Sequence, residues 1–248
     1  MLPQTLKSPI LATVTPRTSE PLPRFPSDPP RHSMPITIES IQIGKVLTEG
    51  NPASRDPAEH QWTTGFYKSP VDHVVDMGCL GIDGDFVADA RHHGGPDKAV
   101  LCYAADHYRA WNEELPDLKM GPGAFGENLT IHGADETSVC IGDQFQLGPC
   151  RIEVSQPRQP CWKIARRWGL STLTKHVSQT GRTGWYIRVH EPGQIQAGQE
   201  MSLLKRPHPD WSIAKANDVL FGKNKDQKAV GELMGLAELA DAWKADLS

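Results

Sequence analysis

One thiol in this sequence has surroundings that favour its ionised form. Cys161 follows Pro160 directly, within the stretch VSQPRQPCWKIARR at residues 154–167. The cations of this stretch are Arg158, Lys163, Arg166 and Arg167. Nearby cations and a helix N-terminus both stabilise a thiolate, which is the form that attacks electrophiles and binds metals. We therefore interpret Cys161 as a functional thiol, although a buried cysteine packed on Trp162 would also fit the pattern.

A second candidate stretch is GIDGDFVADARHHGGPDKAV at residues 81–100, where His93 precedes Gly94 and Gly95. Paired glycines let the backbone approach a ligand closely, and a histidine can donate, accept or bind a metal. The acidic residues of this stretch suggest a calcium loop, but the twelfth position counted from Asp83 is Gly94 instead of the required glutamate. The alternative is a tight turn that carries solvated charges.

A third candidate stretch is GAFGENLTIHG at residues 123–133. Asn128 would present an amide to a ligand, and Glu127 would orient a histidine. The alternative is a glycine loop that leads into a strand. Further along the chain, Lys68 and Arg182 are cations that would bind an anionic ligand through charge-assisted hydrogen bonds, or would otherwise be solvated.

The elements that would position these residues are mostly short strands. Alternating apolar residues bounded by glycine or proline predict strands within residues 36–46, 71–77, 138–148, 151–155, 184–190 and 196–204. Helical spacing predicts one helix across residues 104–115 and a second from near Cys161 through Val177, ending at Gly181. Many short strands with few helices favour a β-barrel or sandwich.

The two ends of the chain differ from this pattern. Residues 1–35 are rich in proline and predict a disordered tail, with Met34 as an alternative start and a transit peptide as another interpretation. Residues 207–248 contain three short helical stripes, which are too few to form an independent core. We expect them to pack on a barrel formed by residues 36–206.

Composition excludes several classes of protein. The net charge of −4 lacks the basic character of nucleic-acid binders, and no apolar run approaches the length of a membrane helix. The chain has five cysteines, an odd number, and no two of them have C-x-x-C spacing. A disulfide framework is therefore not expected. We expect a cytoplasmic protein with no nucleic-acid partner and no membrane contact.

Six motifs occur in a specific order along the chain. They are Lys68-Ser69-Pro70-Val71, Gly81-Ile82-Asp83-Gly84-Asp85, His93-Gly94-Gly95-Pro96-Asp97-Lys98-Ala99, Phe125-Gly126-Glu127-Asn128-Leu129, Gly142-Asp143, and Ser155-Gln156-Pro157-Arg158 with Pro160-Cys161. In this order they resemble the MOSC domain, the family named for the C-terminal domain of molybdenum cofactor sulfurase. The chain is most similar to the bacterial YiiM type, which carries a C-terminal 3-alpha extension.

The resemblance implies a fold and a cofactor. The fold would be mainly β with helices, as a MOSC-type (pyruvate-kinase-like) β-barrel plus a small C-terminal three-helix extension. The cofactor would be Mo-molybdopterin, with Cys161 as the molybdenum ligand and His93 or Asp97 as a proton relay. The cofactor-binding candidates that it implies are Lys68, Arg91, His93, Gly94, Gly95, Asn128, Arg158 and Arg182.

The resemblance also implies an activity, which is the reduction of N-hydroxylated compounds, including N-hydroxylated base analogues, to amines. The small-molecule substrate would be reduced with electrons from a separate donor protein, and the chain would form a homodimer. One alternative is a metal-free enzyme with Cys161 as nucleophile and His93 as base, performing sulfur or acyl transfer. Another is a non-catalytic carrier of the cofactor or of sulfur. The wider family has an association with pyridoxal phosphate, but no lysine here lies in a Schiff-base context.

Overall fold

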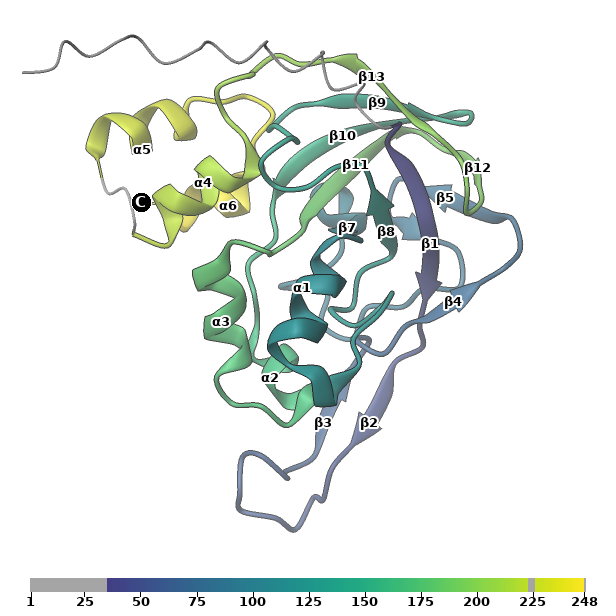
Figure 1. Cartoon of the computed structure of the whole chain (residues 1–248), viewed down its shortest axis with the longest axis vertical. Helices are drawn as coiled ribbons and strands as arrows, with labels where there is room; N and C mark the ends of the chain where they lie inside the picture. The colour runs from purple at the N-terminus through teal and green to yellow at the C-terminus, as the bar shows by residue number, and fades with distance from the viewer. Residues whose placement is uncertain (1–34, 223–225, 248) are drawn as a thin grey trace, which may run out of the picture. The chain divides into compact units, whose positions relative to one another are not determined.

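The computed structural model describes residues 35–222 and 226–247, so the expected tail lies outside the described residues except for Pro35. Its largest element is a curled sheet of eight strands (Figure 1). The strands are β1 (Thr37–Ile43), β4 (Ser69–Val71), β7 (Val100–Ala104), β8 (Leu129–His132), β9 (Gln144–Leu147), β10 (Cys150–Pro157), β11 (Trp185–Glu191) and β13 (Met201–Lys205). They are ordered β13-β9-β10-β11-β7-β8-β1-β4, with antiparallel pairing except between β7 and β8.

The β13 end of this sheet meets the start of β1, which lies next to the other end. The backbone N–H of Ile38 donates to Gln199 at 2.9 Å, and the N–H of Met201 donates to Ile36 at 2.8 Å. The start of β1 is thereby joined to the chain that enters β13. Inward-facing residues such as Ile152 and Ile187 fill the interior and are fully buried. The expected mainly β barrel with C-terminal helices is thus confirmed.

Smaller elements complete the barrel region. Strands β5 (Val75–Gly78), β6 (Gly81–Ile82) and β12 (Gly193–Ile195) form a sheet in the order β12-β5-β6. Strands β2 (Leu47–Glu49) and β3 (Trp62–Thr64) form a hairpin that projects from the eight-stranded sheet (Figure 1). Two short 3-10 helices, η1 (Pro96–Lys98) and η2 (Pro116–Leu118), lie in the connections.

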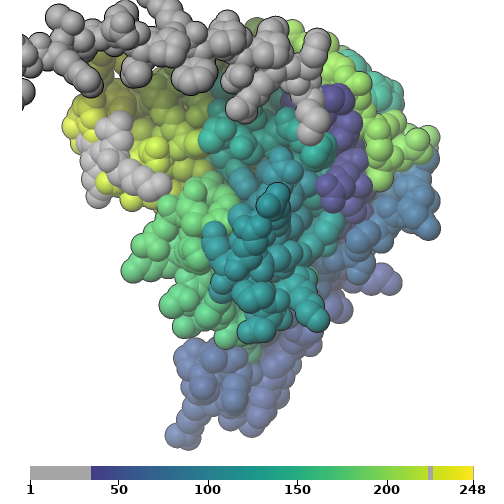
Figure 2. All heavy atoms as spheres, in the orientation of Figure 1, coloured from purple at the N-terminus to yellow at the C-terminus, as the bar shows by residue number. Residues whose placement is uncertain are grey.

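Three helices lie below the eight-stranded sheet in the view of Figure 1: α1 (His107–Glu114), α2 (Trp162–Trp168) and α3 (Leu173–Thr180). The side chains of α1 and α3 form one continuous face in the space-filling view (Figure 2). Beneath that face a separate hydrophobic cluster joins Trp111, Phe125, Ile164 and Val177. This cluster holds the helices against the loops that carry the candidate motifs.

Two expectations about these helices were wrong. The single helix expected from Cys161 to Val177 is divided into α2 and α3, because Gly169 ends α2 in the left-handed conformation with φ 62°. The helix expected from residue 104 begins at His107, since residues 100–104 form strand β7. That strand is buried at every position, so its sequence shows no alternation that would distinguish it from a buried helix.

The C-terminal helices are α4 (Ile213–Leu220), α5 (Gln227–Met234) and α6 (Asp241–Ala245). Their buried residues Ile213, Leu233 and Trp243 belong to the same hydrophobic cluster as Ile152 and Val154 of the barrel. The helices therefore pack on the barrel and share its core, as expected for a piece too small to fold alone. Within the described ranges, no helix has the length and apolar character needed to cross a membrane.

Candidate functional site

A pocket opens where several motif-bearing segments converge. It encloses about 610 Å³ of space, part of which is open solvent. Six of the site residues expected from the sequence line it, namely Lys68, His93, Gly94, Asn128, Arg158 and Cys161. These residues come from four segments that are distant in the chain, and the fold brings them to one place.

The glycine loop that forms one wall is built around a buried carboxylate. Glu127 has no exposed surface, and it accepts hydrogen bonds from the backbone N–H of Gly123 at 2.5 Å and of Phe125 at 3.1 Å. It also accepts from the Tyr108 hydroxyl and, at 3.1 Å, from Thr130. Glu127 therefore shapes the loop and does not orient a histidine, contrary to the sequence interpretation.

A second wall is held by an ion pair between Lys68 and Asp85, whose side chains are each only 8% exposed. Burial lowers the pKa of Lys68, and the adjacent Asp85 carboxylate opposes that effect. Asp85 also accepts from the Asn128 amide at 2.8 Å, and the Asn128 oxygen accepts from the N–H of Leu101 at 3.2 Å. Asn128 thus lines the pocket with its amide engaged by the protein, so its main effect is to fix Asp85.

The four cations near Cys161 point in different directions. Arg158 is 4% exposed and lines the pocket, as does Lys163. Arg166 instead donates to the carbonyl oxygens of Pro57 and His60 in the β2–β3 connection. The fourth cation, Arg167, donates to the carbonyl of Gly123 at 2.7 Å. Only two of the four cations therefore face the pocket, while the other two hold neighbouring loops.

His93 lies half-buried in the pocket lining. Burial, together with the positive charges of Lys163, Arg158 and Lys98, lowers the pKa of His93 to about 4. The imidazole is therefore neutral at pH 7, with one nitrogen that donates and one that accepts. It is correspondingly weak as a base, which disfavours the nucleophile–base pair considered above.

Three expected site residues near His93 lie outside the pocket lining: Arg91, Gly95 and Asp97. Arg91 is exposed beside Asp89, at 3.5 Å. Asp97 pairs with Arg188 at 2.5 Å, an arginine that also contacts Glu153. The expected relay role of Asp97 therefore finds no support, because this carboxylate is directed to a charge cluster away from the pocket.

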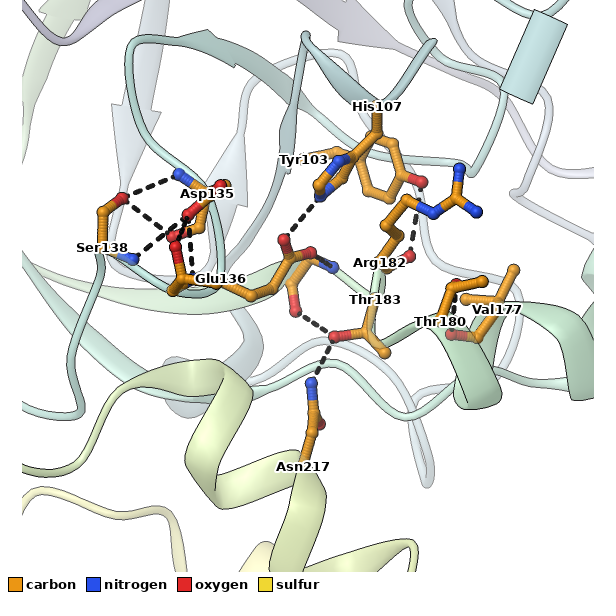
Figure 3. A network of polar contacts seen from close by, with 12 residues as sticks. Tyr103, His107, Asp135, Glu136, Ser138, Val177, Thr180, Arg182, Thr183 and Asn217 are labelled. Carbon is orange, nitrogen blue, oxygen red and sulfur yellow. Dashed lines mark hydrogen bonds and ion pairs between the residues drawn. The ribbon is translucent and has the colours of Figure 1, made fainter. Parts of the chain in front are cut away.

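Arg182 also lies outside the lining, contrary to expectation. Its guanidinium donates to Glu114 at 2.7 Å and lies 3.8 Å from the centre of the Trp111 ring. These contacts tie the start of the β11 connection to α1. The backbone carbonyl of Arg182 accepts from the Tyr103 hydroxyl at 3.3 Å (Figure 3).

The sequence expectations omitted several pocket residues, among them Asp85, Lys98, Lys163 and Tyr186. Tyr186 is buried on β11, and burial raises the pKa of its phenol, so the hydroxyl keeps its proton at neutral pH. The alternation of residues 184–190 could have pointed to Tyr186 as a pocket residue. It places Tyr186 on the strand face opposite Trp185 and Ile187, which fill the core.

The charges and donors of the pocket favour one class of ligand. Four cations line it, Lys68, Lys98, Arg158 and Lys163, against the single carboxylate of Asp85. This excess suits an anionic group, which cations bind through charge-assisted hydrogen bonds. The Cys161 thiol adds a soft ligand, so the donor set fits a thiophilic metal carried by an anionic organic chelate. Within the described ranges, no cluster of three or more histidine, cysteine, aspartate or glutamate side chains is arranged to hold a metal.

Comparisons with known proteins agree on one family. Residues 89–202 match the model of the MOSC domain, and residues 211–247 match the YiiM-like, 3-alpha helix domain. Protein YiiM of Escherichia coli is 35% identical over 179 residues, which cover 71% of this chain and 79% of that protein. A protein named "Reductase" from Gibberella moniliformis is 38% identical over 174 residues, covering 68% of this chain and 31% of its own length.

A solved structure is also similar. The crystal structure of YiiM from Geobacillus stearothermophilus superposes with a TM-score of 0.71 at 32% sequence identity. The match covers 86% of this chain and 97% of that one. The similarity therefore extends through both the barrel and the C-terminal helices.

Proposed function

Since the chain belongs to the MOSC domain family, as a YiiM-like member with a 3-alpha helix domain, we propose that it is a molybdenum-cofactor oxidoreductase. Its substrates are N-hydroxylated compounds, such as N-hydroxylated base analogues, which it reduces to amines. The observation that carries the proposal is a pocket that combines one thiol, Cys161, with four cations. The relative named "Reductase" supports an oxidoreductase role.

Different residues of the pocket bind different parts of the proposed cofactor. When bound, the molybdenum–pterin group supplies the two-electron chemistry that the side chains lack. Cys161 is its protein ligand, because a thiolate is a soft donor. Arg158 and Lys163 bind its anionic part, and the ion pair of Lys68 with Asp85 fixes the opposite wall.

The reaction consumes protons as well as electrons. Breaking the N–O bond of an R–NHOH substrate takes two electrons and two protons and yields R–NH₂ and water. The neutral imidazole of His93 and the protonated phenol of Tyr186 both face the pocket, so each can donate a hydrogen bond to the departing oxygen. We assign the electrons to a separate donor protein.

Metal analysis tests this proposal directly. The full chain is expressed with cofactor supply as wild type, Cys161→Ser and Cys79→Ser, the last being an exposed thiol that does not line the pocket. We expect near-stoichiometric molybdenum in wild type and Cys79→Ser, and loss of it in Cys161→Ser. Reduction of an N-hydroxylated base analogue should follow the molybdenum content.

Other outcomes favour the alternatives. Absence of molybdenum in wild type, or equal molybdenum in Cys161→Ser, would contradict the proposal. A covalent adduct on Cys161 of active, metal-free protein would indicate sulfur or acyl transfer instead. Cofactor binding without turnover would indicate a carrier.

A further inference from the structure

A buried polar network joins α4 of the C-terminal helices to the chain around Thr183 and Glu136 (Figure 3). Its centre is the short segment 182–184, which connects α3 to β11. Glu136, which is 3% exposed, accepts from the backbone N–H of Gly184 at 2.6 Å and contacts His107 at 2.5 Å. The first turn of α4 is tied to the same residue, because the N–H of Ala214 donates to the Glu136 carbonyl at 2.7 Å.

Asn217 of α4 supplies the direct link to this segment. Its side-chain amide donates to the Thr183 hydroxyl at 2.9 Å, and both residues are buried. The Thr183 hydroxyl in turn donates to the Gly184 carbonyl at 3.0 Å. The carbonyl oxygen of the Asn217 side chain is buried without a hydrogen-bond partner in the described part of the chain. A buried oxygen without a hydrogen-bond partner lowers the stability of the fold. If Asn217 only filled space in the core, an apolar side chain would serve equally well.

Residues 183 and 184, which Asn217 helps to fix, also accept hydrogen bonds from Arg158. The backbone N–H of Arg158 donates to the Gly184 carbonyl at 3.0 Å, and its guanidinium contacts the Thr183 carbonyl at 3.5 Å. A third contact, to the Phe125 carbonyl at 3.1 Å, joins the guanidinium to the glycine loop. Two of these three contacts of Arg158 are therefore to carbonyl oxygens of the segment that the Asn217–Thr183 hydrogen bond holds.

We propose that Asn217, from the C-terminal helical domain, is a positioning residue that fixes Arg158 for binding the anionic group of the pocket ligand. This inference rests on the proposed role of the pocket, but it concerns anion binding and not turnover. Inorganic phosphate therefore serves as the probe, with the full chain purified without cofactor. Calorimetry measures the phosphate Kd for wild type, Asn217→Ala, Thr183→Val and the double variant.

Each single change should raise the phosphate Kd about three- to ten-fold, since one hydrogen bond that orients Arg158 is lost. The double variant should match Thr183→Val, because that single change already removes the Asn217–Thr183 hydrogen bond together with the bond from the Thr183 hydroxyl to the Gly184 carbonyl. Thr183→Ser keeps the hydroxyl and should restore the wild-type Kd. Arg158→Lys should weaken binding at least as much, because the fork of donors is lost.

A matched control separates positioning from general destabilisation. Ile213→Val removes one buried methylene from the same helix and should lower the Tm while leaving the phosphate Kd unchanged. The inference is overturned if Asn217→Ala lowers the Tm with a wild-type Kd, if Ile213→Val raises the Kd equally, or if wild type binds no phosphate. Loss of the proposed reductase function would appear instead as missing molybdenum or turnover in wild type, with the phosphate data intact.

Discussion

At the scale of single residues, neighbouring cations of one helix have separate roles. Lys163 and Arg166 lie about one turn apart on α2, yet Lys163 lines the pocket and Arg166 binds backbone carbonyls of the β2–β3 connection. A cation that lies near a functional thiol in the sequence therefore does not by itself line the same pocket. The direction of the side chain decides which carbonyl or ligand the cation contacts.

This difference predicts the outcome of two matched substitutions. Lys163→Ala should weaken phosphate binding about five-fold, because a charge-assisted contact is lost. Arg166→Ala should leave the phosphate Kd unchanged and instead speed amide hydrogen exchange around Pro57 and His60, whose carbonyls it binds. Equal effects of the two variants on phosphate binding would contradict the assignment.

The lowered pKa of His93 predicts a dependence of stability on pH. Its native pKa of about 4 lies below the ordinary value of 6.5, so the unfolded chain binds the proton first as the pH falls. The free energy of unfolding should therefore decrease between pH 6.5 and 4, and this contribution should be constant above pH 7. Urea denaturation of wild type and His93→Gln across this window measures it.

The control for this prediction lies in the same pocket. Lys163→Ala removes one of the charges that lower the pKa of His93, so that pKa should rise towards its ordinary value. Nuclear magnetic resonance of the imidazole in metal-free protein reports it directly. An unchanged pKa would show that Lys163 has little influence on the imidazole.

At the scale of elements, the pocket depends on a loop that a single carboxylate organises. Residues 121–126 contain three glycines, and Gly126 has φ 75° with its α-carbon so close to Phe66 that an added Cβ would lie 3.0 Å from the ring. Such a loop has high conformational entropy when unfolded. The hydrogen bonds that Glu127 accepts compensate for this by fixing the loop in one conformation.

Glu127→Gln should therefore destabilise the protein strongly. The amide removes one acceptor oxygen and the charge, so we expect the free energy of unfolding to fall by about 2–4 kcal/mol. Glu113→Gln is the matched control at an exposed position of α1, where an ion pair with Arg109 contributes at most about 0.5 kcal/mol. Urea denaturation compares the two variants, and equal losses would contradict the role of Glu127.

At the scale of the whole molecule, the barrel and the C-terminal helices form one core. Leu233 of α5 has no exposed surface and belongs to the same cluster as barrel residues such as Val154. Polar contacts cross the same boundary, since the N–H of Ala240 donates to the Ser155 carbonyl at 3.0 Å. We infer that these parts unfold together.

Leu233→Ala tests this cooperativity. It should lower the free energy of unfolding by about 2–5 kcal/mol, and circular dichroism and tryptophan fluorescence should report one shared transition. Lys228→Ala, at an exposed position of the same helix, should change stability by less than about 0.5 kcal/mol. Two separate transitions would show that the helices fold independently.

The sequence allowed prediction where a pattern follows from local physics. Strands β1 and β11 were expected because each has apolar residues that recur on a buried face, whereas β7 was missed because both of its faces are buried. Motif order led to six residues of the pocket lining, among them Cys161 and His93. Arg182 was wrongly predicted to line the pocket, because its direction depends on Glu114, a partner 68 residues away in the chain. The sequence around Arg182 gives no sign of such a distant ion pair.

The seam between β1 and β13 bears on how the protein is made. Ile38 leaves the ribosome early, but the carbonyl to which it donates belongs to Gln199, which is synthesised near the end of the barrel. The nascent chain must therefore carry an unpaired edge on the start of β1 through most of translation. That edge is a site at which a chaperone would protect the nascent chain, and its exposure should limit yield when synthesis is fast.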